Sequence, residues 1–98
     1  MAQFLLTCFD KPGALEIRLA NRPAHIDWLK SHGDKVLMAG PLLSEDGESM
    51  IGSVLIIEAE DLEALKAWQD TDPYAIAGLF SGSSARPMKW ALGKGPQA

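Results

Sequence analysis

The spacing of apolar residues changes repeatedly along this chain, and the order of these changes limits the folds that it can form. Strands place every second side chain on one face, whereas helices repeat every three to four residues. Short apolar runs bounded by turn residues predict strands over residues 3–9, 35–43, 51–58 and 86–92. Helical spacing predicts one helix over residues 14–32 and a second that is capped by Asp61 and ends near Gln69.

Several local features modify this pattern. The first helix is predicted to be amphipathic because its apolar residues recur at helical spacing: Leu15, Leu19, Ile26 and Leu29. Pro23 lacks a backbone donor, so this helix is expected either to kink there or to restart with Pro23 in its first turn. Gly33 is expected to end it as a C-terminal cap. Gly40-Pro41 interrupts or ends the second strand, and residues 81–84 (Ser-Gly-Ser-Ser) are expected to form a flexible loop.

The predicted order β-α-β-β-α-β is that of a ferredoxin-like α+β fold, an antiparallel sheet with two helices on one face. A length of 98 residues suits one domain, here residues 1–98, with residues 93–98 expected to be a frayed tail. The other face of the sheet needs a cover, because a large exposed apolar face would aggregate. A second copy of the chain is the simplest cover, so we expect a homodimer, with higher oligomers left open.

Composition argues against several classes of protein. Nine basic and thirteen acidic residues give a formal charge of −4, which offers no positive surface for nucleic acid or an anionic membrane. The longest apolar runs are too short to span a bilayer, and residues 1–6 lack the basic region of a secretory signal. The single cysteine, Cys8, cannot form an intrachain disulfide and fits the reducing cytoplasm. We interpret Cys8 as a small core residue in preference to a reactive thiol.

His25 is the residue on which any chemistry of this chain most depends. It is one of two histidines, and a histidine can both accept and release a proton near pH 7. If the first helix is continuous, one stripe of it contains Arg18, Arg22, His25, Leu29 and His32. This stripe is either a solvated basic face or a cluster that binds an anionic or oxygen-rich small molecule. His25 and His32 lie about 10 Å apart by helix rise, too far to ligate one metal, so no metal site is predicted.

Asp72-Pro73-Tyr74 is the second candidate, at the start of a short apolar turn or helix over residues 75–79. Asp72 either only caps that helix or also orients an imidazole as the acid member of a proton-transfer pair. Tyr74, the only tyrosine, either donates a phenolic hydrogen bond to a substrate or packs in the core. Gly40-Pro41 and Gly52-Ser53 mark two places where the backbone comes close to a ligand or forms a β-bulge.

Together these motifs resemble those of the YciI-like (YCII-related) proteins. The resemblance covers essentially the whole domain and rests on the order and spacing of Arg22-Pro23-Ala24-His25, Met38-Ala39-Gly40-Pro41, Gly52-Ser53, and Trp68 followed by Asp72-Pro73-Tyr74. It implies a ferredoxin-like fold that dimerises through its sheets into an α/β barrel, similar to the muconolactone isomerase group. It also implies a pocket with a histidine–aspartate pair, here His25 and Asp72. One characterised type of relative is a dehydrochlorinase of chlorinated hydroxyhydroquinones that uses no metal or organic cofactor.

The leading hypothesis is therefore a small cofactor-independent enzyme. His25, held by Asp72, would remove a proton from a hydroxyl or an acidic C–H, giving elimination or isomerisation of a small oxygenated compound, aromatic compounds included. Arg22 or Tyr74 would stabilise the developing oxyanion, and Ser53 and Gly40 would contact the substrate. The alternatives are a non-catalytic dimeric module that binds a small ligand or a protein partner, and an accessory protein with a vestigial pocket.

Overall fold

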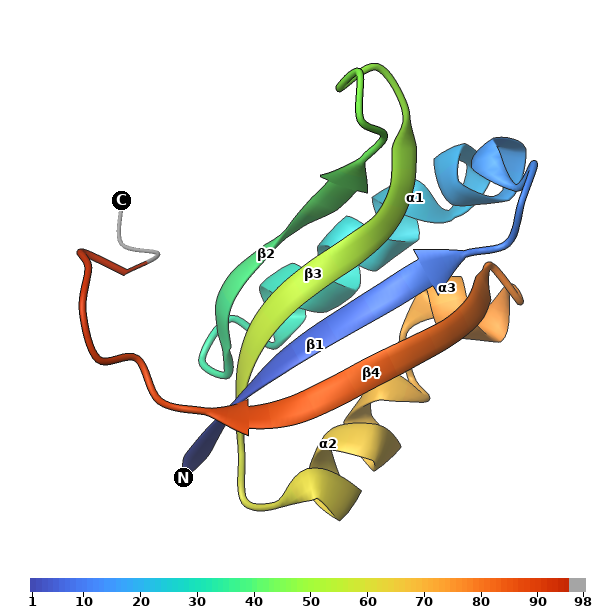
Figure 1. Ribbon diagram of the computed structural model, residues 1–98. Coiled ribbons are helices and arrows are strands. Elements are labelled where there is room, and N and C mark those ends of the chain that lie inside the picture. Colours follow the sequence, from blue (N-terminus) through green and yellow to red (C-terminus); the bar gives the residue numbers. More distant parts are fainter. Residues whose placement is uncertain (96–98) are drawn as a thin grey trace.

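The computed structural model describes residues 1–95, which form a four-stranded antiparallel sheet with helices on one face (Figure 1). The elements along the chain are β1 (Ala2–Asp10), α1 (Leu15–Ser31), β2 (Val36–Leu43), β3 (Met50–Ala59), α2 (Leu62–Gln69), α3 (Pro73–Ile76) and β4 (Phe80–Met88). The strand order is β2-β3-β1-β4, and every neighbouring pair is antiparallel. The predicted ferredoxin-like α+β fold is confirmed.

The main core lies between the sheet and the helices. Alternate residues of β1, namely Phe4, Leu6 and Cys8, are almost fully buried and lie opposite Ile57, Leu55 and Ser53 of β3. On the helix side, α2 contributes Leu65 and Trp68 to the same cluster. Asp61 caps α2 as expected, since its side chain accepts from the backbone N–H of Ala64. Each large apolar side chain that is fully buried here contributes about 1.5–3 kcal/mol.

The predicted orientation of α1 is wrong. Leu15 and Leu19, which were expected on an apolar face, have 42% and 51% of their surface exposed. The two buried residues of α1 are instead Arg18 and His25. Polar side chains can occupy buried positions when hydrogen bonds satisfy them, and both residues have such partners. The helix therefore turns its polar stripe toward the sheet, and the alternative of a fully solvated basic face is wrong.

Pro23 neither restarts nor ends α1, which runs from Leu15 to Ser31 with Pro23 inside it. The missing backbone donor leaves the carbonyl of Leu19 without its helical partner, at an exposed position where water can bind it. Gly33 is not the C-terminal cap: His32 takes that position, and Gly33 does not have a positive φ.

Three predicted boundaries also move. Residues 81–84 lie inside β4, where loop residues were expected, and this strand ends at Met88 instead of at residue 92. Its backbone pairs with β1 over most of its length, and this pairing outweighs the weak strand propensity of serine and glycine. β2 continues through Pro41, which is tolerated because β2 is an edge strand. The short helix is Pro73–Ile76: it begins at Pro73, which suits the first helical position as expected, and it ends before Leu79.

The sheet face opposite the helices is open in the single chain (Figure 1). Leu5 and Phe9 of β1 lie on it, with exposed fractions of 37% and 48%. Within the described residues, no helix is long and apolar enough to cross a membrane. Of the predicted frayed tail, residues 93–98, residues 93–95 lie beyond the end of β4 and belong to no helix or strand, and residues 96–98 lie outside the described residues.

Candidate functional site

A cavity of about 120 Å³ lies between α1, the paired strands β2 and β3, and the start of α3. The predicted substrate-binding residues all line it, together with His25: Arg22, Gly40, Ser53 and Tyr74. An apolar cavity of roughly 150 Å³ engineered in another protein holds benzene, so this volume suits a compound of about one six-membered ring. The cavity is therefore a place where a small molecule can meet the imidazole.

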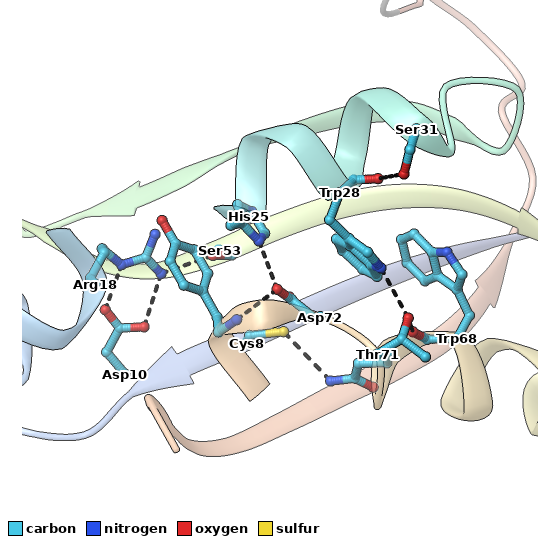
Figure 2. Close-up of polar contacts among 12 residues, drawn as sticks. Cys8, Asp10, Arg18, His25, Trp28, Ser31, Ser53, Trp68, Thr71 and Asp72 are labelled. Atoms are coloured by element: carbon cyan, nitrogen blue, oxygen red, sulfur yellow. Dashed lines mark hydrogen bonds and ion pairs between the residues drawn. The ribbon is translucent and has the colours of Figure 1, made fainter. Parts of the chain in front are cut away.

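His25 and Asp72 meet behind the cavity although 47 residues separate them in sequence. The distance from His25 Nδ1 to Asp72 Oδ1 is 2.8 Å, and both side chains are almost fully buried (Figure 2). A carboxylate only accepts hydrogen bonds, so Nδ1 carries a proton and the neutral ring has its lone pair on Nε2. Among the described residues Nε2 has no hydrogen-bond partner, and His25 lines the cavity. This is the orientation that a general base requires.

Tyr74 holds the histidine–aspartate pair in place. Its backbone N–H donates to the same Asp72 Oδ1 at 2.9 Å, which is the N-terminal cap of α3. Its ring stacks on the His25 imidazole with the ring centroids 3.9 Å apart. Burial raises the pKa of the Tyr74 phenol, against the opposing effect of the Arg18 and Arg22 charges, so the phenol stays protonated at neutral pH. Both proposed roles of Asp72, helix cap and partner of the imidazole, coexist in the structure.

Arg18 forms the second polar cluster at the cavity. Its guanidinium pairs with Asp10, with Nε donating to Oδ2 at 2.7 Å and Nη2 donating to Oδ1 at 2.9 Å (Figure 2). Nη2 also donates to Ser53 Oγ at 2.8 Å. Burial opposes the charge of Arg18, but the hydrogen bonds and the charge of Asp10 outweigh this effect and raise the pKa of the guanidinium. Arg18 is therefore a buried, permanent cation.

The sequence did not identify Asp10 as part of this arrangement. The predicted strand over residues 3–9 leaves Asp10 in the turn that follows, whereas Asp10 ends β1 on the helix side, where the pairing with β4 shifts register between Phe9 and Asp10. The alternation of β1 was the available signal, because Asp10 continues the inward-facing series of Phe4, Leu6 and Cys8. His32 lies away from the cavity, with its ring against Trp28 and Trp68.

Gly52 explains one of the close backbone approaches that the sequence indicated. A Cβ at this position would collide with the carbonyl oxygen of Cys8 on the neighbouring strand, so the approach is between strands and not to a ligand. Gly40 has open space where its Cβ would lie, although it lines the cavity. Among residues 1–95, no group of three histidine, cysteine, aspartate or glutamate side chains is placed to hold a metal ion.

Comparison with known proteins matches residues 2–89 to the family model of the YCII-related domain. Protein YciI of Escherichia coli is 39% identical over 93 residues, which cover 88% of this chain and 95% of that protein. An uncharacterized protein of Haemophilus influenzae is 34% identical over the same shares of the two chains. The structure is similar to that of the 5-chloro-2-hydroxyhydroquinone dehydrochlorinase TftG of Burkholderia phenoliruptrix in complex with 2,5-dihydroxybenzoquinone. For this pair the TM-score is 0.80 at 34% identity, covering 94% of this chain and 96% of the other.

Proposed function

The chain belongs to the YCII-related family, and we propose that it is a small acid–base enzyme that works without a metal or organic cofactor. The observation that carries this proposal is the buried pair of His25 and Asp72, 2.8 Å apart, beside a cavity of about 120 Å³. Asp72 fixes the tautomer of the imidazole, and the stacked ring of Tyr74 fixes its orientation.

The proposed reaction is an elimination or isomerisation of a small oxygenated ring compound. His25 Nε2 accepts a proton from a substrate hydroxyl or an acidic C–H, and the resulting imidazolium can return a proton to a ring carbon. In a dehydrochlorination, His25 then accepts a second proton from a substrate hydroxyl while chloride leaves with the electron pair of its bond, so the net loss is HCl. Positioned proton transfer of this kind contributes about 10²–10⁴-fold in rate. The dehydrochlorinase TftG, 34% identical to this chain, supports this class of reaction.

The other cavity residues are proposed to bind the substrate. Arg22 or Tyr74 stabilises the negative charge that develops on a substrate oxygen, since both side chains are donors at the cavity wall. Ser53 and the backbone at Gly40 complete the contact surface. The size of the cavity favours a single ring, phenolic, quinonoid or lactone in chemistry.

We propose further that two chains pair through the open sheet face. Leu5 and Phe9 are exposed there in a single chain, and a second copy would remove them from water. The cytoplasm is the proposed compartment. Its reducing conditions suit the lone thiol of Cys8, whose pKa burial raises to about 12.

The test is turnover of a panel of phenolic, quinonoid and lactone compounds that includes 5-chloro-2-hydroxyhydroquinone, with chloride release as one readout. His25→Ala is expected to lower kcat by about 10²–10⁴-fold while the variant keeps its circular dichroism spectrum. His32→Ala is the matched control, because this second histidine lies outside the cavity, and it should keep activity within a few-fold. Full activity in His25→Ala would refute the mechanism. Binding of a panel compound without any turnover would favour the non-catalytic ligand-binding module.

A further inference from the structure

A second hydrogen bond joins α1 to the turn that carries Asp72. The indole Nε1 of Trp28 donates to Thr71 Oγ1 at 2.9 Å, beside the 2.8 Å contact of His25 with Asp72 (Figure 2). Trp28 follows His25 by three residues, so both side chains lie on the same side of the helix. Because Thr71 directly precedes Asp72, the two contacts join the same two segments at neighbouring points.

The hydroxyl of Thr71 has a fixed orientation because it is used in both directions. Its Oγ1 accepts from Trp28 and donates to the backbone carbonyl of Trp68 at 2.6 Å. A hydroxyl can do both, since it has one donor and two acceptor lone pairs. The Trp28 ring also stacks on the Trp68 ring, with the centroids 4.3 Å apart and the planes at 24°. The end of α2 therefore holds the indole in the orientation in which its N–H meets Thr71.

Each of the two joined segments needs an anchor from outside itself. Pro23 lies inside α1, two residues before His25, and removes one backbone hydrogen bond of the helix there. On the other side, Asp72 lies between α2 and the four-residue α3, in a turn where Thr71 is exposed. Groups that transfer protons need placement to within about 0.5 Å. A contact that fixes both segments at once meets this need.

Trp28 and Thr71 act on the site without touching a ligand. Neither of them lines the cavity. The Trp28 ring is tilted by 34° to the His25 imidazole with the centroids 5.9 Å apart, so it does not stack on it as Tyr74 does. Any effect of these two residues on the chemistry must therefore pass through the placement of His25 and Asp72.

We propose that Trp28 and Thr71 are positioning residues, whose hydrogen bond holds the part of α1 that carries His25 against the turn that carries Asp72. The inference rests on the proposed function, because the placement of the imidazole affects a reaction only if His25 is the base. Without this bond the helix and the turn separate more often, and each separation breaks the contact of Nδ1 with Asp72 and exposes its proton to water.

The experiment measures how fast the Nδ1 proton of His25 exchanges with water, by NMR of the ¹⁵N-labelled full chain. Thr71→Val keeps the shape of threonine without its hydroxyl, and the loss of one hydrogen bond should speed this exchange about 3–10-fold. Trp28→Phe loses the N–H and part of the stacked area, so its effect should be at least as large. Adding Thr71→Val to Trp28→Phe should speed the exchange no further, since both changes remove the same bond.

Two further variants separate positioning from general stability. Thr71→Ser restores the hydroxyl and should return the exchange rate to within about twofold of the wild type. Asp61→Ala is the matched control, because it removes the cap at the other end of α2 and lowers stability without contacting Thr71 or Trp28. It should leave the exchange of the His25 proton within about twofold, as expected for a local opening.

A panel compound that is turned over gives a second readout. Thr71→Val should lower kcat about 3–10-fold and leave KM within about twofold, because it displaces the base and leaves the cavity wall unchanged. Thr71→Ser should recover this kcat, and a kcat in Thr71→Val equal to that of the wild type would contradict the positioning role.

Two exchange results would overturn the inference. One is a rate that stays within about twofold of the wild type in both Thr71→Val and Trp28→Phe. The other is an equal acceleration in Asp61→Ala, which would mean that the proton reports only overall stability. The exchange measurement needs no substrate, so it fails independently of the proposed function. Faster exchange in Thr71→Val with full activity in His25→Ala would refute the enzyme alone, and unchanged exchange with an inactive His25→Ala would refute the positioning role alone.

Discussion

The carboxylate of Asp72 serves two buried donors at once, which makes its replacement by alanine a quantitative test of the site geometry. Oδ1 accepts from His25 Nδ1 at 2.8 Å and from the backbone N–H of Tyr74 at 2.9 Å. Asp72→Ala removes the cap of α3, at a cost of about 0.5–2 kcal/mol. It also leaves the buried His25 N–H without an acceptor, at a further cost of about 1–3 kcal/mol. The free energy of unfolding should therefore fall by about 1.5–5 kcal/mol.

Asp61→Ala is the matched control for this change. Asp61 caps α2 at an exposed position, where its Oδ1 accepts from Ala64 N at 2.8 Å. Its loss removes a cap without leaving a buried side-chain donor unpaired, so the free energy of unfolding should fall by only about 0.5–2 kcal/mol. Asp72→Asn should resemble this control, because an amide oxygen can still accept from both donors. Flipping that amide would set its NH₂ group against the N–H of Tyr74, so the orientation with the oxygen inward should persist.

Urea unfolding of the variants measures these differences in the free energy of unfolding. All variants are compared at one protein concentration, because the stability of a dimer depends on concentration. Thermal unfolding gives a second estimate, at about 4–8 °C per kcal/mol for a domain of this size. If Asp72→Ala costs no more than Asp61→Ala, the hydrogen bond to His25 contributes nothing in the folded protein. The reasoning that places the imidazole and assigns its tautomer would then fail.

Three further predictions test the packing. Gly52→Ala should cost about 1–3 kcal/mol because its Cβ would meet the carbonyl of Cys8, whereas Gly40→Ala, with open space, should change the urea midpoint little. Burial raises the pKa of Cys8 from 9.0 to about 12, so the folded state holds this proton more tightly and stability should fall as the pH rises from 9 toward 12. In urea titrations between pH 9 and pH 12, the free energy of unfolding of Cys8→Ala should fall less steeply than that of the wild type. An equal fall in both proteins would contradict the burial of the thiol. Phe9→Asp or Leu5→Asp on the open sheet face should convert the proposed dimer to monomers in light scattering, and an unchanged mass would exclude this face as the interface.

Local patterns determined the order of the elements. The alternating residues of β1 form the inner face of the sheet, and the aspartate before the second helical run caps α2. These features depend on residues close in sequence, because strand alternation and helix capping are local properties of the backbone. The candidate pair of His25 and Asp72 followed from the family resemblance, since no local pattern brings together two residues 47 positions apart.

The tertiary structure alone decided which face of α1 is buried. Apolar spacing favoured Leu15 and Leu19, yet Arg18 and His25 face the sheet, because their hydrogen-bond partners lie on other elements of the fold. Arg18 is satisfied by Asp10 and by Ser53, which is 35 residues away, and these contacts make burial of a charge tolerable. Likewise, residues 81–84 carry little strand propensity and become a strand by pairing with β1 at the opposite end of the chain. The sequence by itself thus determined the succession of helices and strands, whereas long-range hydrogen bonds, which local spacing does not report, decided the polar interior of the site.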